Sequence, residues 1–186
     1  MKEVFGSNLE KAELSFSSGC QKNRGIEMAK RILLIEDDPD FLRMMYQILV
    51  EEGYEVAVAS RTDMAKRWVM DKEIGFDMII SDQRMPGELG ASFLSFVEEL
   101  EKTPTDKIES APIYQEMRQR FSKLSDDEYR AFVKGICVKP HIRVILSGYA
   151  EDGGIQKALD DKKIHKFISK KTPITDILGQ IKELLG

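Results

Sequence analysis

Five polar residues of this sequence each stand at the end of a short, mostly apolar run. With the run that each follows or closes, they are Glu36 and Asp37 (31–35), Asp82 (77–81), Ser147 (143–146) and Lys170 (166–169). Three carboxylates brought together would repel one another, and a hard dication would relieve that repulsion. Because neither His nor Cys accompanies them, Mg²⁺ or Mn²⁺ is favoured over zinc. An ammonium group and a hydroxyl beside such an ion could bind phosphoryl oxygens, so the set suits phosphoryl transfer.

The segments around these residues alternate between two patterns. Short runs rich in apolar and β-branched residues predict strands at 31–35, 55–59, 77–81, 143–146 and 166–169. Apolar residues at helical spacing predict a helix after each strand, including one at about 91–102 and one near 151–162. Five strands alternating with five helices predict an α/β fold with a doubly wound parallel sheet. In such a sheet ligands bind at the carboxyl ends of the strands, so the five polar residues should converge there.

Each of these side chains also has a simpler explanation. Acidic residues that follow a strand often cap the next helix, and Asp38, with Pro39 after it, suits that role. That leaves Asp37 as the better metal ligand of the two. Lys170 and Ser147, taken singly, could be ordinary surface residues. Their occurrence at the ends of the first, third, fourth and fifth strands favours a common site.

Composition excludes several classes of protein. The 186 residues carry a net charge of −4 with both signs mixed, which argues against direct binding to nucleic acid. The two cysteines, Cys20 and Cys137, have no partners at metal-binding spacing, so neither zinc nor a disulfide framework is expected. No apolar run is long enough to cross a membrane, and the start lacks the apolar core of a secretory signal. We therefore expect a cytoplasmic protein.

Two segments fall outside the alternating pattern. Residues 1–29 are polar and weakly periodic, which predicts a flexible extension or a short docked helix, and Met28 is an alternative start. Residues 103–140 contain two helical patterns and no strand; the second begins at Ser125 with a capping box. The apolar faces of these helices must be buried. They could pack on the flank of the domain, in a homodimer or against a partner.

The chain resembles the receiver domain of bacterial response regulators. The matching stretches are ILLIEDDPDFLR (32–43), FDMIISDQRMPGELG (76–90), VILSGYAE (144–151) and KFISK (166–170). The resemblance covers about 30–102 and 141–186, and the Asp-x-x-Met-Pro-x-x-x-Gly motif from Asp82 to Gly90 is its most specific part. It implies a flavodoxin-like five-stranded sheet of order 2-1-3-4-5. The domain would span 30–186, with 103–140 as a helical insertion between the third helix and the fourth strand.

The resemblance also implies a role for each acidic residue. Asp82 would be the phosphoacceptor, forming an acyl phosphate. Asp37 would bind Mg²⁺ directly and Glu36 through a water molecule, because its side chain is longer. The backbone carbonyl of Arg84 would complete the protein's share of the metal site.

The other residues to which the resemblance gives a role would bind the phosphoryl group or change conformation when it is present. Ser147 and Lys170 would contact its oxygens, and Gly148 is small enough to leave a path to Asp82. Ser147 would move toward the phosphate while the ring of Phe167 turns inward, which alters the face formed by the fourth helix, fifth strand and fifth helix. An ordinary core phenylalanine is an equally good interpretation of Phe167.

Two departures from the family pattern stand close to these residues. Lys171 occupies the position after Lys170 where the family usually has a proline with a cis bond, and Pro173 comes two positions later, so the loop could be rerouted. Arg84 and Tyr149 are bulky residues beside Asp82 and Ser147. We expect them to shield the acyl phosphate and prolong its lifetime.

These observations favour a stand-alone receiver that is not an enzyme in the ordinary sense. It would take a phosphoryl group from a histidine kinase or phosphotransfer protein and act by binding an output protein, through the switch face or the 103–140 insertion. One alternative is a degenerate receiver, an interaction module that is never phosphorylated, and Lys171 is the residue that supports it. Another is an aspartate-nucleophile phosphohydrolase. That chemistry expects Asp at the end of the first strand, where Glu36 stands.

Overall fold

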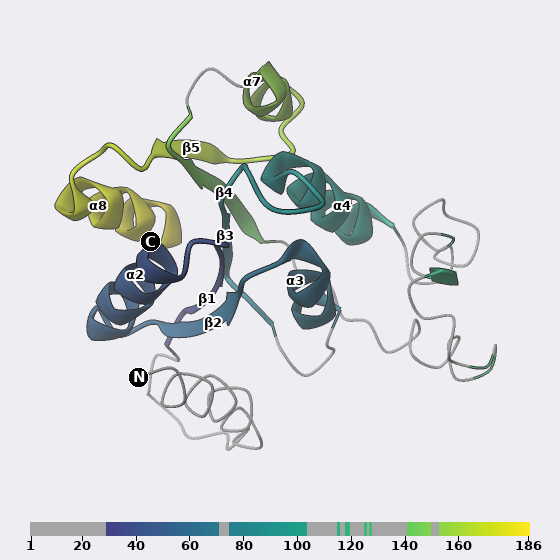
Figure 1. The fold of residues 1–186 in the computed structure, drawn as a ribbon, viewed down its shortest axis with the longest axis horizontal. Coiled ribbons are helices and arrows are strands. Elements are labelled where there is room, and N and C mark those ends of the chain that lie inside the picture. Colours follow the sequence, from purple (N-terminus) through teal and green to yellow (C-terminus); the bar gives the residue numbers. More distant parts are fainter. Residues whose placement is uncertain are drawn as a thin grey trace.

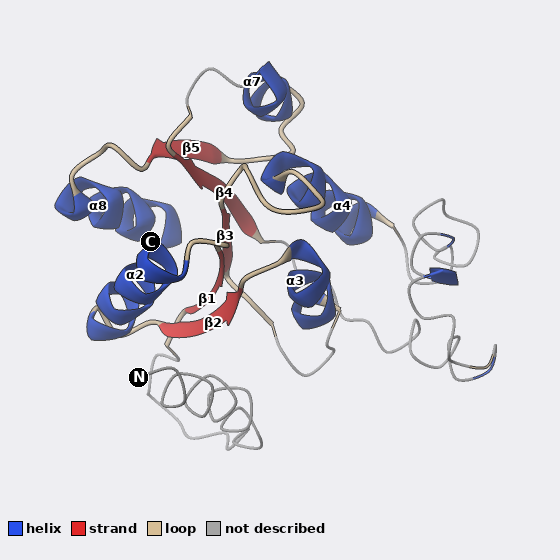
Figure 2. Cartoon of the chain, viewed as in Figure 1, coloured by secondary structure: helices blue, strands red, loops and turns tan. Residues whose placement is uncertain are grey.

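Five strands and five helices alternate along the part of the chain that the computed structural model describes (Figures 1 and 2). That part comprises residues 29–70, 75–103, 115, 118–119, 125, 127, 141–149 and 153–186. The elements are β1 (Arg31–Ile35), α2 (Pro39–Glu51), β2 (Glu55–Ala59), α3 (Thr62–Val69), β3 (Met78–Ser81), α4 (Gly90–Lys102), β4 (Ile142–Ser147), α7 (Gly153–Asp160), β5 (Lys166–Ser169) and α8 (Ile174–Leu185). The extension predicted at 1–29 and the helices predicted within 103–140 lie outside the described residues, apart from a few single positions.

The strands form one parallel sheet of order β2-β1-β3-β4-β5, which confirms the predicted doubly wound topology. Helices α2 and α8 cover one face, and α3, α4 and α7 cover the other (Figure 1). Each face has its own apolar core, and side chains alternate between the two along the strands. Leu33 and Ile35 of β1, for example, belong to the core under α3 and α4, whereas Ile32 and Leu34 belong to the core under α2 and α8. Burial of apolar surface on both faces is the main term that stabilises such a sheet.

The parallel register brings the carboxyl ends of the strands to one edge. Ile35 pairs with Ser81, Ser81 with Ile145, and Ser147 with Ser169. Because Ile142 pairs with Met78 and Ser147 pairs with Ser169, β4 is one residue longer at each end than the predicted 143–146. The residues that directly follow these strands therefore lie side by side along one rim.

Local chemistry sets where two of the helices begin and end. Asp38 caps α2, as predicted: its carboxylate accepts hydrogen bonds from the backbone N–H groups of Asp40 and Phe41, at 2.9 and 3.1 Å. Helix α7 ends at Asp160, earlier than the predicted 162. There Lys162 adopts a left-handed φ of 59°, and the Lys163 N–H donates back to the carbonyl of Ala158 at 2.8 Å.

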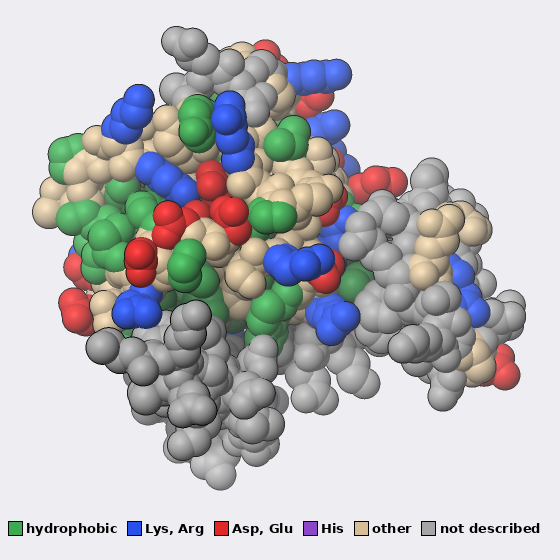
Figure 3. All heavy atoms as spheres, in the orientation of Figure 1, with side chains coloured by type: hydrophobic (Ala, Val, Ile, Leu, Met, Phe, Trp, Pro, Cys, Tyr) green, Lys and Arg blue, Asp and Glu red, His purple; other side chains and the backbone are tan. Residues whose placement is uncertain are grey.

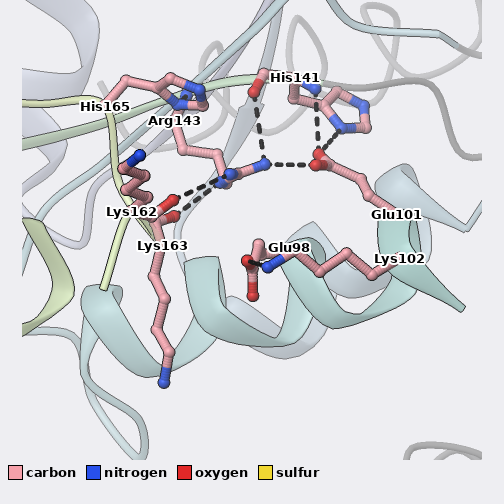
Figure 4. Close-up of polar contacts among 8 residues, drawn as sticks. All are labelled: Glu98, Glu101, Lys102, His141, Arg143, Lys162, Lys163 and His165. Atoms are coloured by element: carbon pink, nitrogen blue, oxygen red, sulfur yellow. Dashed lines mark hydrogen bonds and ion pairs between the residues drawn. The ribbon is translucent and has the colours of Figure 1, made fainter. Parts of the chain in front are cut away.

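A buried arginine joins three elements at the opposite end of the sheet (Figure 4). Arg143 of β4 pairs with the Glu101 carboxylate near the end of α4. Its Nε donates to the Lys163 carbonyl at 2.6 Å and its Nη2 to the Lys162 carbonyl at 3.4 Å, both in the loop before β5. Glu101 Oε1 also accepts a hydrogen bond from the His141 N–H at 3.0 Å and lies 2.8 Å from its Nδ1. The network thus ties the end of α4 to the start of β4, the two elements that segment 103–140 connects.

Replacing Glu101 by Gln is expected to lower the free energy of unfolding by about 3 kcal/mol at pH 7, because a buried guanidinium loses its counter-ion. Burial alone would raise the pKa of the Glu101 carboxyl, but hydrogen bonds from His141 and Arg143 and the charge of Arg143 outweigh it, so the pKa lies below its ordinary value. A lowered carboxyl pKa contributes stability above about pH 4.5, and this is lost as the pH falls through the folded-state pKa. Denaturant unfolding at pH 7 and pH 4 should therefore show a smaller acid-dependent loss for the variant. The exposed Glu99→Gln is the control, and parallel pH profiles for Glu101→Gln and wild type would contradict the prediction.

None of the described helices combines the length and hydrophobicity needed to cross a lipid bilayer.

Candidate functional site

Three carboxylates meet at the rim formed by β1 and β3. The backbone N–H of Glu36 donates to the Ala59 carbonyl at 3.0 Å and that of Asp82 to the Ile35 carbonyl at 2.9 Å, so both residues directly extend the sheet. Oxygen atoms of Glu36, Asp37 and Asp82 all lie within 4.8 Å of one another. Acidic side chains gather in the middle of this face of the molecule, with basic side chains beside them (Figure 3). Glu36 and Asp82 are buried, whereas Asp37 is exposed.

Lys170 reaches into this acidic cluster from the end of β5. Its Nζ lies 2.6 Å from Glu36 Oε2 and 3.0 Å from Asp82 Oδ2. Burial alone would lower the pKa of the Lys170 ammonium, but hydrogen bonds to the two carboxylates and their charges raise it above its ordinary value. Lys170 therefore stands as a fixed positive charge beside Asp82. Its loop runs through Lys171 with no cis peptide bond among the described residues.

Glu36 is the most deeply buried of the three acidic residues. Burial raises the pKa of its carboxyl, the neighbouring Asp82 charge raises it further, and the hydrogen bond and charge of Lys170 offset these effects only in part. Its Oε1 also accepts a hydrogen bond from the Asp38 N–H at 3.3 Å. A second positive charge at this position would favour the ionised carboxylate, because one lysine does not compensate three acids.

The hydroxyl at the end of β4 contacts the backbone of Tyr149, whose ring is stacked against a second side chain. Ser147 is fully buried, and its Oγ accepts a hydrogen bond from the Tyr149 N–H at 3.4 Å. The Arg84 guanidinium lies over the Tyr149 ring, 3.6 Å from its centroid, and Tyr149 as a whole is 54% exposed. Arg84 follows β3 and Tyr149 follows β4, so this contact joins the loops that carry Asp82 and Ser147. A Cβ atom added at Gly148 would meet no atom within 4 Å, so the space in front of that residue is open.

The turn after Asp82 is closed by its own backbone. The Gly90 N–H donates to the Gln83 carbonyl at 2.9 Å, and the Ala91 N–H donates to Gln83 Oε1 at 3.0 Å, which satisfies an N–H of the first turn of α4. A Cβ atom at Gly90 would lie 2.0 Å from the Asp82 carbonyl oxygen. Only glycine allows α4 to begin this close to Asp82.

Two aromatic side chains lie near Lys170 and along β5. Phe167 is half-buried against the core under α3, α4 and α7, and its strand position pairs with Ile145. The ring of Phe41, on α2, lies 4.5 Å from Lys170 Nζ. Phe41 was not among the residues that the sequence predicted for the site. Its place within the first turn of α2, directly after the acidic residues 36–38, is the signal that could have assigned it to the site.

The model of the response regulator receiver domain family matches residues 32–124, which is half of the chain. The chain belongs to this family. The match begins at β1 and includes all three acidic residues of the rim. Members of this family act in signal transduction rather than as metabolic enzymes.

Curated relatives and solved structures agree with this assignment. The two-component response regulator ARR14 of Arabidopsis thaliana is 34% identical over 71 residues, covering 38% of this chain and 19% of that protein. The hydrogenase transcriptional regulatory protein HoxA of Bradyrhizobium diazoefficiens is 26% identical over 152 residues, covering 82% of this chain and 23% of that protein. This receiver domain thus spans less than a quarter of the length of these relatives.

Structural similarity shows the same fold. A CheY-like receiver domain from Methanospirillum hungatei superposes with a TM-score of 0.57 at 21% identity, covering 85% of this chain and 94% of that one. The response regulator TrrA from Thermotoga maritima, solved in complex with Mg²⁺ and BeF, has a TM-score of 0.52 at 19% identity, covering 83% and 98% of the two chains. At these identities the structural comparisons establish the fold alone.

Proposed function

We propose that this receiver domain accepts a phosphoryl group on the Asp82 carboxylate from a histidine kinase or phosphotransfer protein. The observation that carries the proposal is the position of Lys170, whose Nζ contacts Glu36 and Asp82 at the centre of the acidic cluster. A nucleophilic carboxylate next to a fixed ammonium group is suited to phosphoryl transfer, in which positioning and charge neutralisation supply most of the rate.

The donor set fits Mg²⁺ or Mn²⁺. Three carboxylates within 4.8 Å of one another offer oxygen ligands only, and one lysine leaves them with excess negative charge. We assign Asp37 and Asp82 as direct ligands, Glu36 as a ligand through water, and the Arg84 backbone carbonyl as the fourth protein group. When bound, the ion would neutralise phosphoryl oxygens that Lys170 does not reach.

The protein's own groups carry the covalent step. An Asp82 carboxylate oxygen forms a bond to phosphorus while the phosphorus–nitrogen bond of a phosphohistidine breaks, and the departing imidazole takes up a proton. Lys170 holds positive charge beside the accepting carboxylate, and we expect the Ser147 hydroxyl to donate a hydrogen bond to a phosphoryl oxygen. The Asp82 carboxylate is itself oriented by the Gln83 N–H, which donates to its Oδ1 at 2.6 Å.

The output would follow from the same charge change. Phosphorylation would draw Ser147 toward the new group and free space for Phe167 to turn inward, which alters the face formed by α7, β5 and α8. We propose that an output protein binds this face or the 103–140 insertion, and that the exchange with the kinase takes place in the cytoplasm. A homodimer, formed through the insertion, is a further outcome that size-exclusion chromatography would detect.

The direct test is to incubate the protein with Mg²⁺ and either beryllofluoride or a small phosphodonor. We expect a fluorine NMR signal from the bound beryllofluoride, and a phosphoryl group that mass spectrometry locates on Asp82. Chelation of Mg²⁺ should remove both results. A folded protein that forms neither adduct in Mg²⁺ would reject the proposal in favour of the degenerate receiver.

The degenerate alternative rests on Lys171, which replaces the proline that the family usually has. The Lys171 N–H donates to Ser169 Oγ at 3.2 Å, so the loop closes on its own strand. The preceding Lys170 still reaches Asp82 at 3.0 Å. The geometry around Lys171 therefore supports the phosphoacceptor proposal.

Replacing Tyr149 by Ala is expected to speed loss of the phosphoryl group by about threefold. The reason is that the Arg84–Tyr149 stack would shield Asp82 from water, and an exposed cation–π contact of this kind is worth about 0.5–1 kcal/mol. The rate is measured from the decay of phosphorylated protein after the donor is removed. Tyr149→Phe keeps the ring and should decay like wild type. If Tyr149→Ala also decays at the wild-type rate, the stack does not shield the site.

A further inference from the structure

A lysine is buried next to the loop that follows Asp82. Lys66, on the inner side of α3, is only 1% exposed. Its Nζ lies 3.0 Å from Glu88 Oε1 and 4.3 Å from the centre of the Phe96 ring on α4. Charged side chains are almost never fully buried unless they are paired, because desolvation of an ammonium group is costly. The position of Lys66 therefore requires an explanation.

The partner of Lys66 stands in the loop that joins β3 to α4. Arg84 and Leu89 form an antiparallel bridge within this loop, and Glu88 directly precedes Leu89. At its base the loop is closed by the Gln83–Gly90 hydrogen bond of 2.9 Å. The Lys66–Glu88 ion pair is an additional anchor that ties the loop to a helix outside it. The same loop carries the Arg84 carbonyl that we assign to the metal.

Stability alone does not account for this pair. Replacement of a buried ion pair by apolar side chains of similar volume is often neutral or stabilising. Here the pair carries an added cost, because Glu88 Oε2 is buried and has no hydrogen-bond partner among the described residues. Unlike an apolar contact, a hydrogen-bonded ion pair fixes the orientation of its two side chains relative to each other.

We propose that Lys66 is a positioning residue which, through Glu88, holds the 83–89 loop in the conformation that presents the Arg84 carbonyl to the metal site. This inference rests on the proposed function, since it concerns the same metal and phosphoryl pocket. Lys66 does not touch the reacting atoms; it acts through the loop. Groups that support metal ligands from outside in this way typically change metal affinity by about 10- to 100-fold when they are replaced.

The test separates positioning from stability with a double variant, Lys66→Leu with Glu88→Met. We expect it to unfold at the wild-type temperature or above, because an apolar pair replaces a desolvated ion pair. Its Mg²⁺ dissociation constant, measured by calorimetry with MgCl₂ alone, should rise by about tenfold. Amide hydrogen exchange at 83–89 should accelerate. A matched control removes the exposed Lys182–Glu52 pair, whose atoms lie 2.6 Å apart, and should leave the Mg²⁺ affinity unchanged.

The outcomes distinguish this inference from the proposed function. If wild type binds neither Mg²⁺ nor beryllofluoride, the proposed function fails and the positioning role fails with it. If wild type binds both and the double variant equals it in Mg²⁺ affinity and loop exchange, the pair is structural and only the positioning role is overturned. Should the double variant fail to fold, Glu88→Gln carries the same test. We then expect Mg²⁺ binding several-fold weaker than wild type, and an unchanged affinity overturns the inference.

Discussion

Replacing Asp82 by Asn is expected to abolish labelling by a small phosphodonor and binding of beryllofluoride. The amide oxygen is a far weaker nucleophile than a carboxylate oxygen, and it brings no negative charge to the metal site. The fold should be retained, because Asn has the same shape and its side-chain oxygen can still accept the hydrogen bond that Gln83 N–H donates to Asp82 at 2.6 Å. Phosphorylation is measured by mass spectrometry in the presence of Mg²⁺.

The same variant should also change how Mg²⁺ affects stability. Asp82 raises the pKa of the Glu36 carboxyl by repulsion, so without metal the acidic pocket contains unrelieved like charge. We expect the wild-type protein to unfold at a higher temperature when Mg²⁺ is added, and Asp82→Asn to show a smaller increase. The control is Asp63→Asn, which removes an exposed carboxylate that pairs with Arg61. Labelling of Asp82→Asn at the wild-type rate would show that another residue is the acceptor.

The fold was predictable because its signals are local and repeat along the sequence. Apolar runs of four to six residues and faces at helical spacing are consequences of a sheet that is buried on both sides. Alternation of the two patterns leaves few topologies for parallel strands joined by right-handed crossovers. The strand ends then follow, and with them the meeting of Glu36, Asp37, Asp82 and Lys170 at one rim, although these residues are far apart in the sequence.

The burial of charged residues inside a helix or strand could not be predicted from the sequence. Lys66 and Arg143 are charged residues in a helix and a strand, and sequence alone assigns such residues to solvent. Both are buried because a partner distant in the chain compensates the charge: Glu88 for Lys66 and Glu101 for Arg143. The end of α7 was misplaced for a related reason. A left-handed lysine at 162 ends the helix where glycine would be the usual signal.

For the site, the sequence predicts which residues take part but not how their side chains contact one another. The sequence separates Asp38 from Asp37 through its capping pattern, and the structure shows Asp38 as the cap of α2. The sequence gives no indication that Lys170 bridges Glu36 and Asp82, or that Arg84 stacks on Tyr149. Such contacts depend on the conformations of three loops at once, so only the folded chain defines them.

Loss of the Lys170 charge should have opposite effects on phosphoryl transfer to Asp82 and on Mg²⁺ binding. Replacing Lys170 by Met, which has a similar length and no charge, is expected to slow phosphorylation of Asp82 by about 100-fold. A preorganised positive group is lost from the place where charge accumulates on the phosphoryl oxygens. Binding of Mg²⁺ should instead become tighter, because a competing cation 2.6 Å from Glu36 and 3.0 Å from Asp82 is removed.

Measuring both quantities on one protein reveals what Lys170 acts upon. The rate of phosphorylation at saturating Mg²⁺ and the Mg²⁺ dissociation constant should both fall in Lys170→Met, so that phosphorylation slows while metal affinity rises. Neither should change in Lys171→Met, which removes the exposed neighbouring lysine. If Lys170→Met instead lost Mg²⁺ affinity and recovered its rate at high Mg²⁺, the lysine would serve to organise the carboxylates. A slow rate that persists at saturating Mg²⁺ assigns the ammonium group to the phosphoryl group itself, because no metal-binding defect then remains to explain it.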